Sequence, residues 1–161
     1  MTVDYTTYAK CDIDDNLRTV VAQLLANQGK VRGNLLRKAD RCMFICIAQI
    51  DGQPIGMGAI KQATARDFDA DTSGLEELRA TFPWELGYFY TDAAHAGRGI
   101  ASHIVDLLLQ RHGSHNLMAS TEVSPPSAMV RILERNRFQQ KGKHWPSAIH
   151  GNQLGLFLRF A

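Results

Sequence analysis

The fold of this chain is decided by one stretch, Trp84 to His112, which reads WELGYFYTDAAHAGRGIASHIVDLLLQRH. Its first part, Trp84–Thr91, is rich in aromatic residues, which favour a half-buried strand. Gly97-Arg98-Gly99 then breaks that pattern. After the glycines, apolar residues recur at helical spacing, at Ile100, Ala101, Ile104, Val105, Leu108 and Leu109. The stretch therefore predicts a strand, a glycine turn and a helix in succession.

The glycine turn before this helix predicts a binding site for an anion. The first N–H groups of a helix have no partner within it, and the helix dipole is positive at this end. Glycine lacks the Cβ atom that would hold a phosphate away from those N–H groups. Residues 97–102 are therefore expected to bind a group the size of a pyrophosphate.

Two common phosphate-binding motifs do not fit this turn. A nucleoside-triphosphate loop needs Gly-Lys-Ser/Thr after four free positions, and a dinucleotide fingerprint needs Gly or Ala where this chain has Ser102. The turn resembles instead motif A of the GNAT superfamily of N-acetyltransferases, Q/R-x-x-G-x-G/A, over the run Ala96-Gly97-Arg98-Gly99-Ile100-Ala101. The first position departs from the motif, because Ala96 stands where the family has Gln or Arg.

Further strands and helices follow from residue spacing and turn residues. Asp12 or Asp14 can cap a helix that runs to about Gln28, where Gly29 ends it. The predicted strands are Val3–Tyr8, Met43–Ile50, Pro54–Gln62, Trp84–Thr91, Asn116–Val123, Phe138–Trp145 and Gln153–Phe160. Asp51-Gly52 is predicted to form a hairpin turn between the second and third of these strands. The last helix is predicted to begin at Ser124-Pro125-Pro126-Ser127. Gly56 and Gly58 share one strand face, which predicts either a close approach from that side or a bulge or tight packing.

Two polar segments each have a structural and a functional interpretation. Lys30–Arg41 holds five cations against one Asp, which predicts a short helix with a solvated face, or a cation that contacts a phosphate. The acidic segment Ala63–Pro83 is interpreted as an insertion, either a solvated excursion or a lid that attracts a cationic substrate. Within it, Ser73-x-x-Glu76 is a capping box that predicts a helix of about two turns.

The order of these elements resembles the GNAT order along essentially the whole chain. The resemblance implies an α/β (α+β) fold with a mixed, mostly antiparallel sheet of about six or seven strands and about four flanking helices. It also implies that two parallel strands, Trp84–Thr91 and Asn116–Val123, splay apart beside the cofactor. A length of 161 residues predicts a single domain over residues 1–161.

The resemblance implies acetyl-CoA as co-substrate and direct attack of an amine on its thioester. The pyrophosphate would then bind at the turn, on Ala96, Gly97, Arg98, Gly99, Ile100, Ala101 and Ser102. The pantetheine arm would bind the strand backbone at Phe89, Tyr90 and Thr91. The expected function is an N-acetyltransferase, an acyltransferase that acts on a primary amine of a small molecule or peptide.

The attacking amine needs a group that takes its proton, because an alkylamine with a pKa near ~10.4 is mostly protonated at neutral pH. Glu85 is the predicted base, since its position fourteen residues before Gly99 resembles that of family members with a glutamate base on this strand. Glu122 on the neighbouring strand is the alternative. The acid for the leaving thiolate stays open among Ser124, Ser127, Tyr88 and water, because Leu133 occupies the family's tyrosine position.

Composition limits the class of protein further. A net charge of +2 argues against nucleic-acid binding, and the longest apolar run, Met43–Ile50, is too short to span a membrane. Three cysteines without a C-x-x-C pair, scattered histidines and a polar amino terminus predict a cytoplasmic protein with no metal site. The acceptor amine and the oligomeric state, a homodimer included, stay open. A non-catalytic acyl-CoA-binding module with the same fold is the alternative function.

Overall fold

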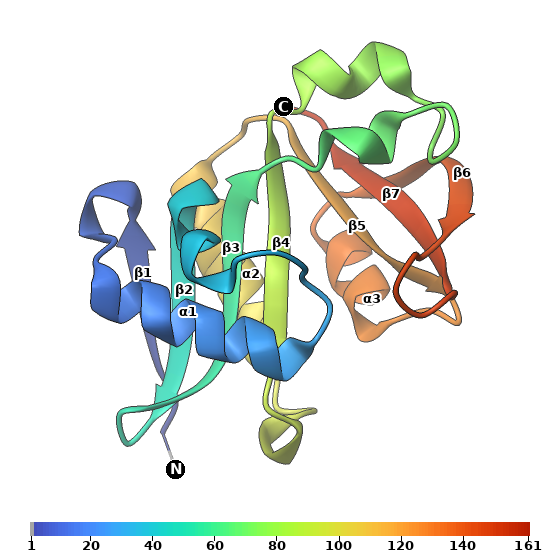
Figure 1. The fold of residues 1–161 in the computed structure, drawn as a ribbon. Coiled ribbons are helices and arrows are strands. Elements are labelled where there is room, and N and C mark those ends of the chain that lie inside the picture. The colour runs from blue at the N-terminus through green and yellow to red at the C-terminus, as the bar shows by residue number, and fades with distance from the viewer. Residues whose placement is uncertain (1) are drawn as a thin grey trace. The chain divides into compact units, whose positions relative to one another are not determined.

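Residues 2–161 are described by a computed structural model, and they form a mixed α/β fold (Figure 1). The helices and strands are β1 (Asp4–Ala9), α1 (Asp15–Gln28), β2 (Cys42–Ile50), β3 (Gln53–Gln62), β4 (Trp84–Thr91), α2 (Ile100–His112), β5 (Leu117–Ser124), α3 (Ala128–Arg135), β6 (Gln139–Pro146) and β7 (Gln153–Arg159). The sheet order is β1-β2-β3-β4-β5-β7-β6. Antiparallel pairs predominate, and β4 pairs with β5 in parallel through Glu85 and Met118. The predicted fold class is confirmed.

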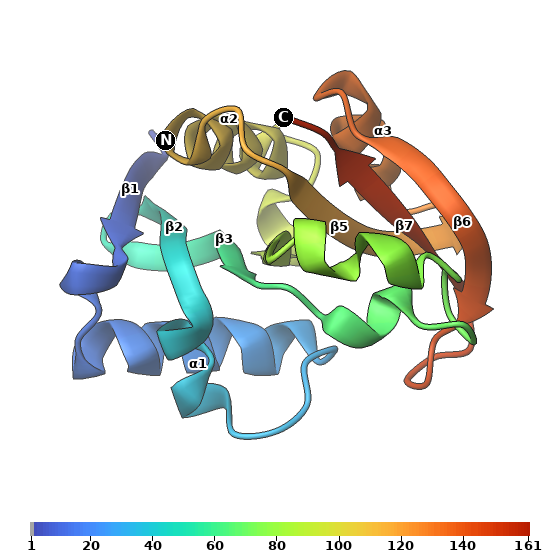
Figure 2. The ribbon, with the colours of Figure 1, turned by 90° about the horizontal axis from the view of Figure 1, so that it is seen from above.

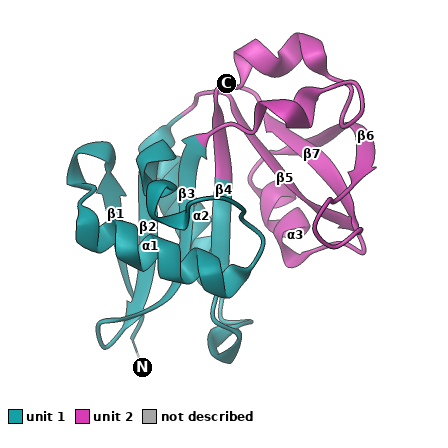
Figure 3. Cartoon of the chain, in the orientation of Figure 1, with its two compact units in different colours: residues 1–61, 87–113 teal, residues 62–86, 114–161 magenta. Residues whose placement is uncertain are grey.

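The chain divides into two compact units, each with its own core (Figure 3). The first unit holds the described residues up to Lys61 together with Gly87–Gly113, and the second holds Gln62–Leu86 together with Ser114–Ala161. Strand β4 contributes its first three residues to the second unit and the remainder to the first.

In the first unit, α1 and α2 cover opposite faces of strands β1 to β3 (Figure 2). The apolar face of α1 packs against β2 and β3 in a cluster that includes Leu17, Val21, Leu24, Leu25, Ile45, Ile47, Met57 and Ala59. Asp14 caps α1 because its Oδ1 accepts a hydrogen bond from the backbone N of Leu17 at 2.8 Å. Gly29 ends the helix in the left-handed region, with φ of 75°. The helix predicted to end at about Gln28 is therefore confirmed, and of the two possible caps, Asp12 and Asp14, it is Asp14 that caps it.

The turn between β2 and β3 has the conformation that its residues predict. Asp51 has φ of 50° and Gly52 has φ of 77°. Two successive residues with positive φ match the twist of a tight hairpin, and Asp-Gly tolerates that conformation. The turn fixes the register between β2 and β3, so that Ile50 lies opposite Gln53.

The segment Lys30–Arg41 does not form the single short helix that we expected. It contains two separate 3-10 turns, η2 (Leu35–Arg37) and η3 (Ala39–Arg41). The Asn34 side chain accepts from the Leu36 backbone N at 3.1 Å and starts the first turn after Gly33, whose φ is 94°. Only a few residues then remain before β2, and 3-10 turns are the helices that fit short connections.

In the second unit, the acidic segment Ala63–Pro83 is part of the core and is not a solvated excursion. Its side chains Phe68 and Phe82 are fully buried and pack with β5, β6 and β7 residues, namely Met118, Trp145, Leu156 and Leu158. Lys143 ties β6 to it, because Nζ donates to the Ala70 carbonyl at 2.7 Å. The segment is therefore anchored at both ends by aromatic residues.

The capping box predicted in this segment is also wrong. The helix there is the 3-10 helix η5 (Glu76–Thr81), with Leu75 at its N-cap position and no side-chain capping bond. Ser73 is 1% exposed, so its side chain is buried within the second unit and does not cap a helix. Burial of the flanking apolar residues outweighs the capping preference of serine.

Candidate functional site

Strand β4 lies close against β3 in the first unit, and the two β3 glycines allow this. A Cβ atom on Gly58 would lie 2.5 Å from the ring of Phe89, and one on Gly56 would lie 3.0 Å from the Tyr90 carbonyl oxygen. Such distances exclude any larger side chain at these positions. The glycines therefore allow tight packing on this face, against the neighbouring strand β4 and against Ile100 and Ile104 of α2.

The backbone of β4 is irregular immediately before Phe89, Tyr90 and Thr91, the residues predicted to bind the pantetheine arm. Tyr88 has φ of 60°, which is uncommon for a bulky residue and marks local strain within the strand. The next carbonyl, that of Phe89, accepts a hydrogen bond from Gln28 Nε2 of α1 at 2.6 Å. This contact was missed at the sequence level, because the two residues are 61 positions apart and nothing in either segment indicates the pairing.

Gln28 holds one further polar atom beside β4. Its Oε1 is buried and has no hydrogen-bond partner among the described residues. Flipping the amide would set Oε1 against the Phe89 carbonyl, so the observed orientation is the favourable one. Gln28 therefore supports the β4 backbone at Phe89, while Tyr90 and Thr91 continue the strand towards the glycine turn.

The glycine turn joins β4 to α2 through a 3-10 turn, η6 (Ala93–His95), which Asp92 caps by accepting from the Ala94 backbone N at 2.9 Å. Gly97 and Gly99 then take left-handed conformations, with φ of 77° and 75°. The first helical hydrogen bond of α2 runs from the His103 N to the Gly99 carbonyl at 3.0 Å. The predicted sequence of strand, glycine turn and helix is confirmed.

The amino end of α2 differs electrostatically from that of α1. Gly99 at its N-cap position offers no side-chain capping bond, and the first turn contains no acidic residue. By contrast, Asp14 caps α1 and Asp15 lies in its first turn. At the turn before α2, the guanidinium of exposed Arg98 lies 3.4 Å from the Nδ1 of His95. Neither the N-cap residue nor the first turn of α2 therefore supplies a carboxylate to the positive end of the helix dipole.

The geometry of this turn fits a diphosphate. Residues 96–99 are exposed, whereas Ile100 is buried and anchors the helix start. No protein atom lies within 4 Å of the position that a Cβ would take on Gly97 or Gly99. The space over both glycines is open, so an anion can approach the backbone N–H groups of the turn.

Glu85 is buried near the start of β4, in the second unit. The residue is only 6% exposed, and its Oε1 accepts a hydrogen bond from the Thr64 backbone N at 2.8 Å. The carboxylate therefore has a defined orientation near the start of β4.

Glu122, the alternative carboxylate, lies in β5 and contacts the loop between β6 and β7. Its Oε1 is 2.9 Å from His150 Nε2, and its Oε2 is 3.5 Å from Asn152 Nδ2. The sequence did not indicate that His150 contacts Glu122, because His150 belongs to a loop with no recognisable motif. Only the antiparallel pairing of β5 with β7 brings the loop beside Glu122.

The candidate proton donors for the leaving thiolate differ in their surroundings. Leu133 is fully buried and has no polar atom in its side chain. Ser127 Oγ is hydrogen-bonded to Thr121 Oγ1 at 2.7 Å. The Tyr88 ring is buried, with Lys61 Nζ 5.0 Å from its centroid. The geometry therefore does not single out one of these groups as the proton donor.

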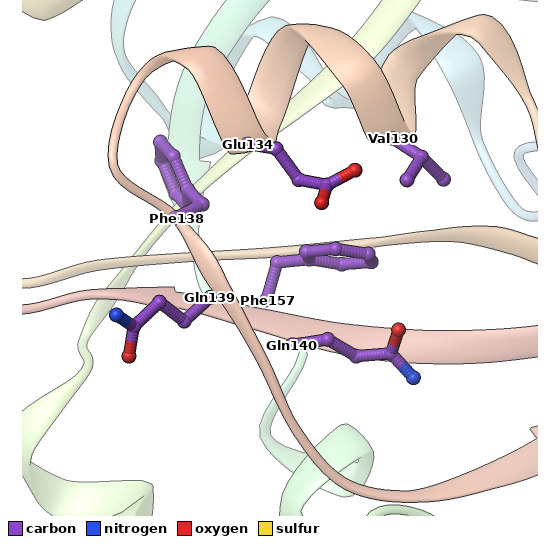
Figure 4. A pocket seen from close by; sticks show the side chains of 6 residues that line it. All are labelled: Val130, Glu134, Phe138, Gln139, Gln140 and Phe157. Atoms are coloured by element: carbon purple, nitrogen blue, oxygen red, sulfur yellow. The ribbon is translucent and has the colours of Figure 1, made fainter.

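A pocket of about 360 Å³ lies in the second unit between α3 and the strands β6 and β7 (Figure 4). It is lined by Val130, Glu134, Phe138, Gln139, Gln140 and Phe157. None of these is a predicted site residue. Residues 2–161 contain no group of three or more His, Cys, Asp or Glu side chains that could hold a metal ion. No helix within the same range is long and apolar enough to cross a membrane.

Comparison with known proteins defines the class to which this fold and turn belong. The chain belongs to the acetyltransferase (GNAT) family, whose sequence profile matches residues 8–135. No curated protein sequence matches it.

Solved structures share the fold over nearly the whole chain. An acyl-CoA N-acyltransferase from Pseudomonas aeruginosa is 13% identical with a TM-score of 0.67, and the match covers 98% of this chain and 99% of that chain. NAA60 from Arabidopsis thaliana, with a bisubstrate analogue, is 14% identical with a TM-score of 0.66 and 98% coverage of both chains. Diaminobutyrate acetyltransferase EctA from Paenibacillus lautus, with L-2,4-diaminobutyric acid and coenzyme A, is 16% identical with a TM-score of 0.61, covering 99% of this chain and 96% of that chain. Identities this low establish the shared fold alone.

Proposed function

We propose that this protein transfers the acetyl group of acetyl-CoA to a primary amine of a small molecule or peptide. Family membership indicates an acetyltransferase. The similar structures of NAA60 with a bisubstrate analogue and of EctA with an amino acid and coenzyme A support an amine acceptor and a coenzyme A donor. The observation that carries the proposal is the uncapped amino end of α2 behind two left-handed glycines.

The chain's own residues divide into two binding segments. The backbone N–H groups of residues 97–102 hold the diphosphate, with Arg98 adding positive charge from an exposed position. Phe89, Tyr90 and Thr91 supply β4 backbone to the pantetheine arm, and Gln28 keeps the Phe89 carbonyl in place. When bound, acetyl-CoA would supply an activated acyl thioester, which these residues would orient.

Proton transfer is assigned to Glu85. Since only about one alkylamine molecule in ~10³ is unprotonated at neutral pH, a carboxylate that accepts the proton raises the nucleophilic fraction. Glu85 is buried and oriented by the Thr64 N–H, so it accepts the proton through a water rather than by direct contact. The leaving thiolate, with a thiol pKa near ~8.5, needs no strong acid, which is consistent with the apolar side chain of Leu133 at the family's tyrosine position.

The decisive experiment measures acetyl-CoA affinity of Gly99→Ala by calorimetry. A Cβ at Gly99 meets no protein atom but stands in front of the diphosphate, so we expect affinity to fall at least about tenfold, or ~1.4 kcal/mol. Gly52→Ala is the matched control, because Gly52 also has positive φ and open space around its Cβ position. Both variants carry a similar backbone strain of ~1–2 kcal/mol. Equal affinities in the two variants would remove the turn from the binding site.

A second candidate function is a non-catalytic acyl-CoA-binding module with the same fold. It is favoured by Ala96 in the motif and by the buried Leu133 at the family's tyrosine position. The two candidates are separated by mixing the protein with acetyl-CoA and a panel of amines and measuring free thiol. Thiol release that depends on an amine supports the transferase, whereas acetyl-CoA binding without any release supports the binding module.

A further inference from the structure

Strand β4 departs from regular strand geometry at Tyr88, directly before the segment predicted to bind the pantetheine arm. Tyr88 has φ of 60°, whereas strand residues have φ between about −60° and −160°. A bulky residue keeps such a conformation only where the contacts around it hold it in place. Its ring is 9% exposed and packs in the same core cluster as Leu24 and Leu25 of α1. Helix α1 thus fixes the Tyr88 side chain, and the backbone that follows is supported separately.

That support is the side chain of Gln28, the last residue of α1. Its Nε2 donates to the Phe89 carbonyl at 2.6 Å. Because a peptide group is planar, a fixed Phe89 carbonyl also fixes the direction of the Tyr90 N–H. The Phe89 ring meanwhile packs against Gly58, where even a Cβ atom would lie 2.5 Å from it. One hydrogen bond from α1 therefore holds the peptide group between Phe89 and Tyr90.

Gln28 is itself held firmly, so its amide is a fixed point for β4. Leu24 and Leu25, in the turn of α1 before it, are 4% and 0% exposed. Gly29 follows it in the left-handed region, and the Gly29 N donates to the Leu25 carbonyl at 3.0 Å. These contacts close the helix at Gln28. A movement of the Phe89 carbonyl would therefore break the hydrogen bond rather than carry Gln28 with it.

The Gln28 amide lowers stability in one respect, because its Oε1 is buried and has no hydrogen-bond partner among residues 2–161. Buried polar atoms are almost always paired, and a buried oxygen without a partner is unfavourable. Methionine is similarly long and unbranched and has no oxygen to bury. An apolar side chain would therefore serve packing alone, and the polar amide is explained by the bond that its Nε2 donates to β4.

We propose that Gln28 is a positioning residue for the coenzyme: it holds the irregular backbone of β4 at Phe89 and Tyr90 in the conformation that the pantetheine arm binds. The inference rests on the proposed function and adds a residue of α1 to the coenzyme site. The amide groups of a pantetheine arm pair with strand backbone as a peptide does. Such pairing depends on the direction of each backbone carbonyl and N–H, so a relaxed peptide group at this point binds the arm more weakly.

The test compares coenzyme A with ADP, which carries adenosine and the diphosphate but no pantetheine arm. By calorimetry, we expect Gln28→Met to bind coenzyme A at least about fivefold more weakly than the wild type and to bind ADP within about twofold of it. Its thermal midpoint should stay within about 4 °C of the wild type. Gln23→Met is the matched control, because Gln23 is an exposed glutamine of the same helix that bonds to Asn27. This control should bind both ligands as the wild type does.

A variant that retains a donor separates positioning from packing. Gln28→Lys keeps N–H donors for the Phe89 carbonyl, so the ratio of its coenzyme A affinity to its ADP affinity should exceed that of Gln28→Met. The ratio corrects for the effect of the added charge on the diphosphate, which both ligands carry. A merely structural role would lower thermal stability and weaken both ligands alike, and that result would overturn the inference.

Gly99→Ala distinguishes failure of this inference from failure of the proposed function, because it should weaken coenzyme A and ADP together. If it does so while Gln28→Met binds coenzyme A as the wild type does, the diphosphate site stands and Gln28 has no part in coenzyme binding. If the wild-type protein binds neither ligand, the proposed function fails and this inference fails with it.

Discussion

At the scale of single residues, the predicted base Glu85 and its alternative Glu122 have different surroundings. Glu85 is buried and accepts a backbone N–H, whereas Glu122 is partly exposed and meets a histidine and an asparagine. Glu85 has one orientation fixed by the Thr64 N–H, whereas Glu122 can be reached from solvent. The same residue type therefore occupies two different environments on neighbouring strands.

Glu85→Gln is expected to lower turnover at least about tenfold and to leave acetyl-CoA affinity within about twofold. Glutamine keeps the oxygen that accepts from the Thr64 N–H, so the fold is retained while the proton acceptor is lost. Steady-state kinetics and calorimetry measure the two effects separately. Glu77→Gln, an exposed glutamate of the same unit, is the control. Turnover equal to wild type in Glu85→Gln would show that Glu85 is not the base.

At the scale of elements, β2 begins at a buried thiol whose ionisation is coupled to folding. Burial raises the pKa of the Cys42 thiol from 9.0 to about 12, and Lys61 opposes that shift without cancelling it. Cys42 Sγ lies 3.6 Å from the Lys38 carbonyl, which is compatible with a protonated thiol that donates. The folded protein therefore keeps this thiol protonated in a pH range where the unfolded chain releases the proton.

This coupling predicts a loss of stability at alkaline pH. A pKa raised on folding contributes stability that is fully present below 9.0 and is lost as pH rises from there towards 12. Between pH 8 and pH 10 we expect the wild-type protein to lose ~1–1.5 kcal/mol more of its free energy of unfolding than Cys42→Ala does. Urea denaturation at the two pH values measures the difference. Parallel losses in both proteins would contradict a buried, protonated Cys42.

At the scale of the whole molecule, the chain has two compact units and one strand that belongs to both. The sequence predicts a single domain, and β4 provides a covalent and hydrogen-bonded element common to the two cores. Unfolding of either core would disorder β4, and the other core depends on that strand. We therefore expect both units to unfold together.

The two units can be followed by different signals. Trp84 and Trp145, the two tryptophans of the chain, both belong to the second unit, whereas the long helices α1 and α2 belong to the first. Tryptophan fluorescence and far-ultraviolet circular dichroism should therefore give the same urea midpoint and the same slope. Two separate midpoints would mean that the units unfold independently and that the single-domain prediction is wrong.

The sequence by itself determined several local elements and the glycine turn before α2. Helix α1, the Asp51-Gly52 hairpin and the passage from β4 through Gly97 and Gly99 into α2 all follow from spacing, caps and positive φ, which are properties of neighbouring residues. For the same reason the order of elements, and with it the family, could be predicted from the chain alone.

Only the tertiary structure decided which distant residues meet. The bond from Gln28 to Phe89 and the contact of His150 with Glu122 join segments far apart in sequence. Residues 63–83 look solvated because of their charges, yet Phe68 and Phe82 are fully buried and anchor the segment to a core built mainly by later strands. The physical reason is that local propensity is a weak preference, whereas burial of apolar surface and pairing of buried polar groups depend on partners that only the folded chain supplies.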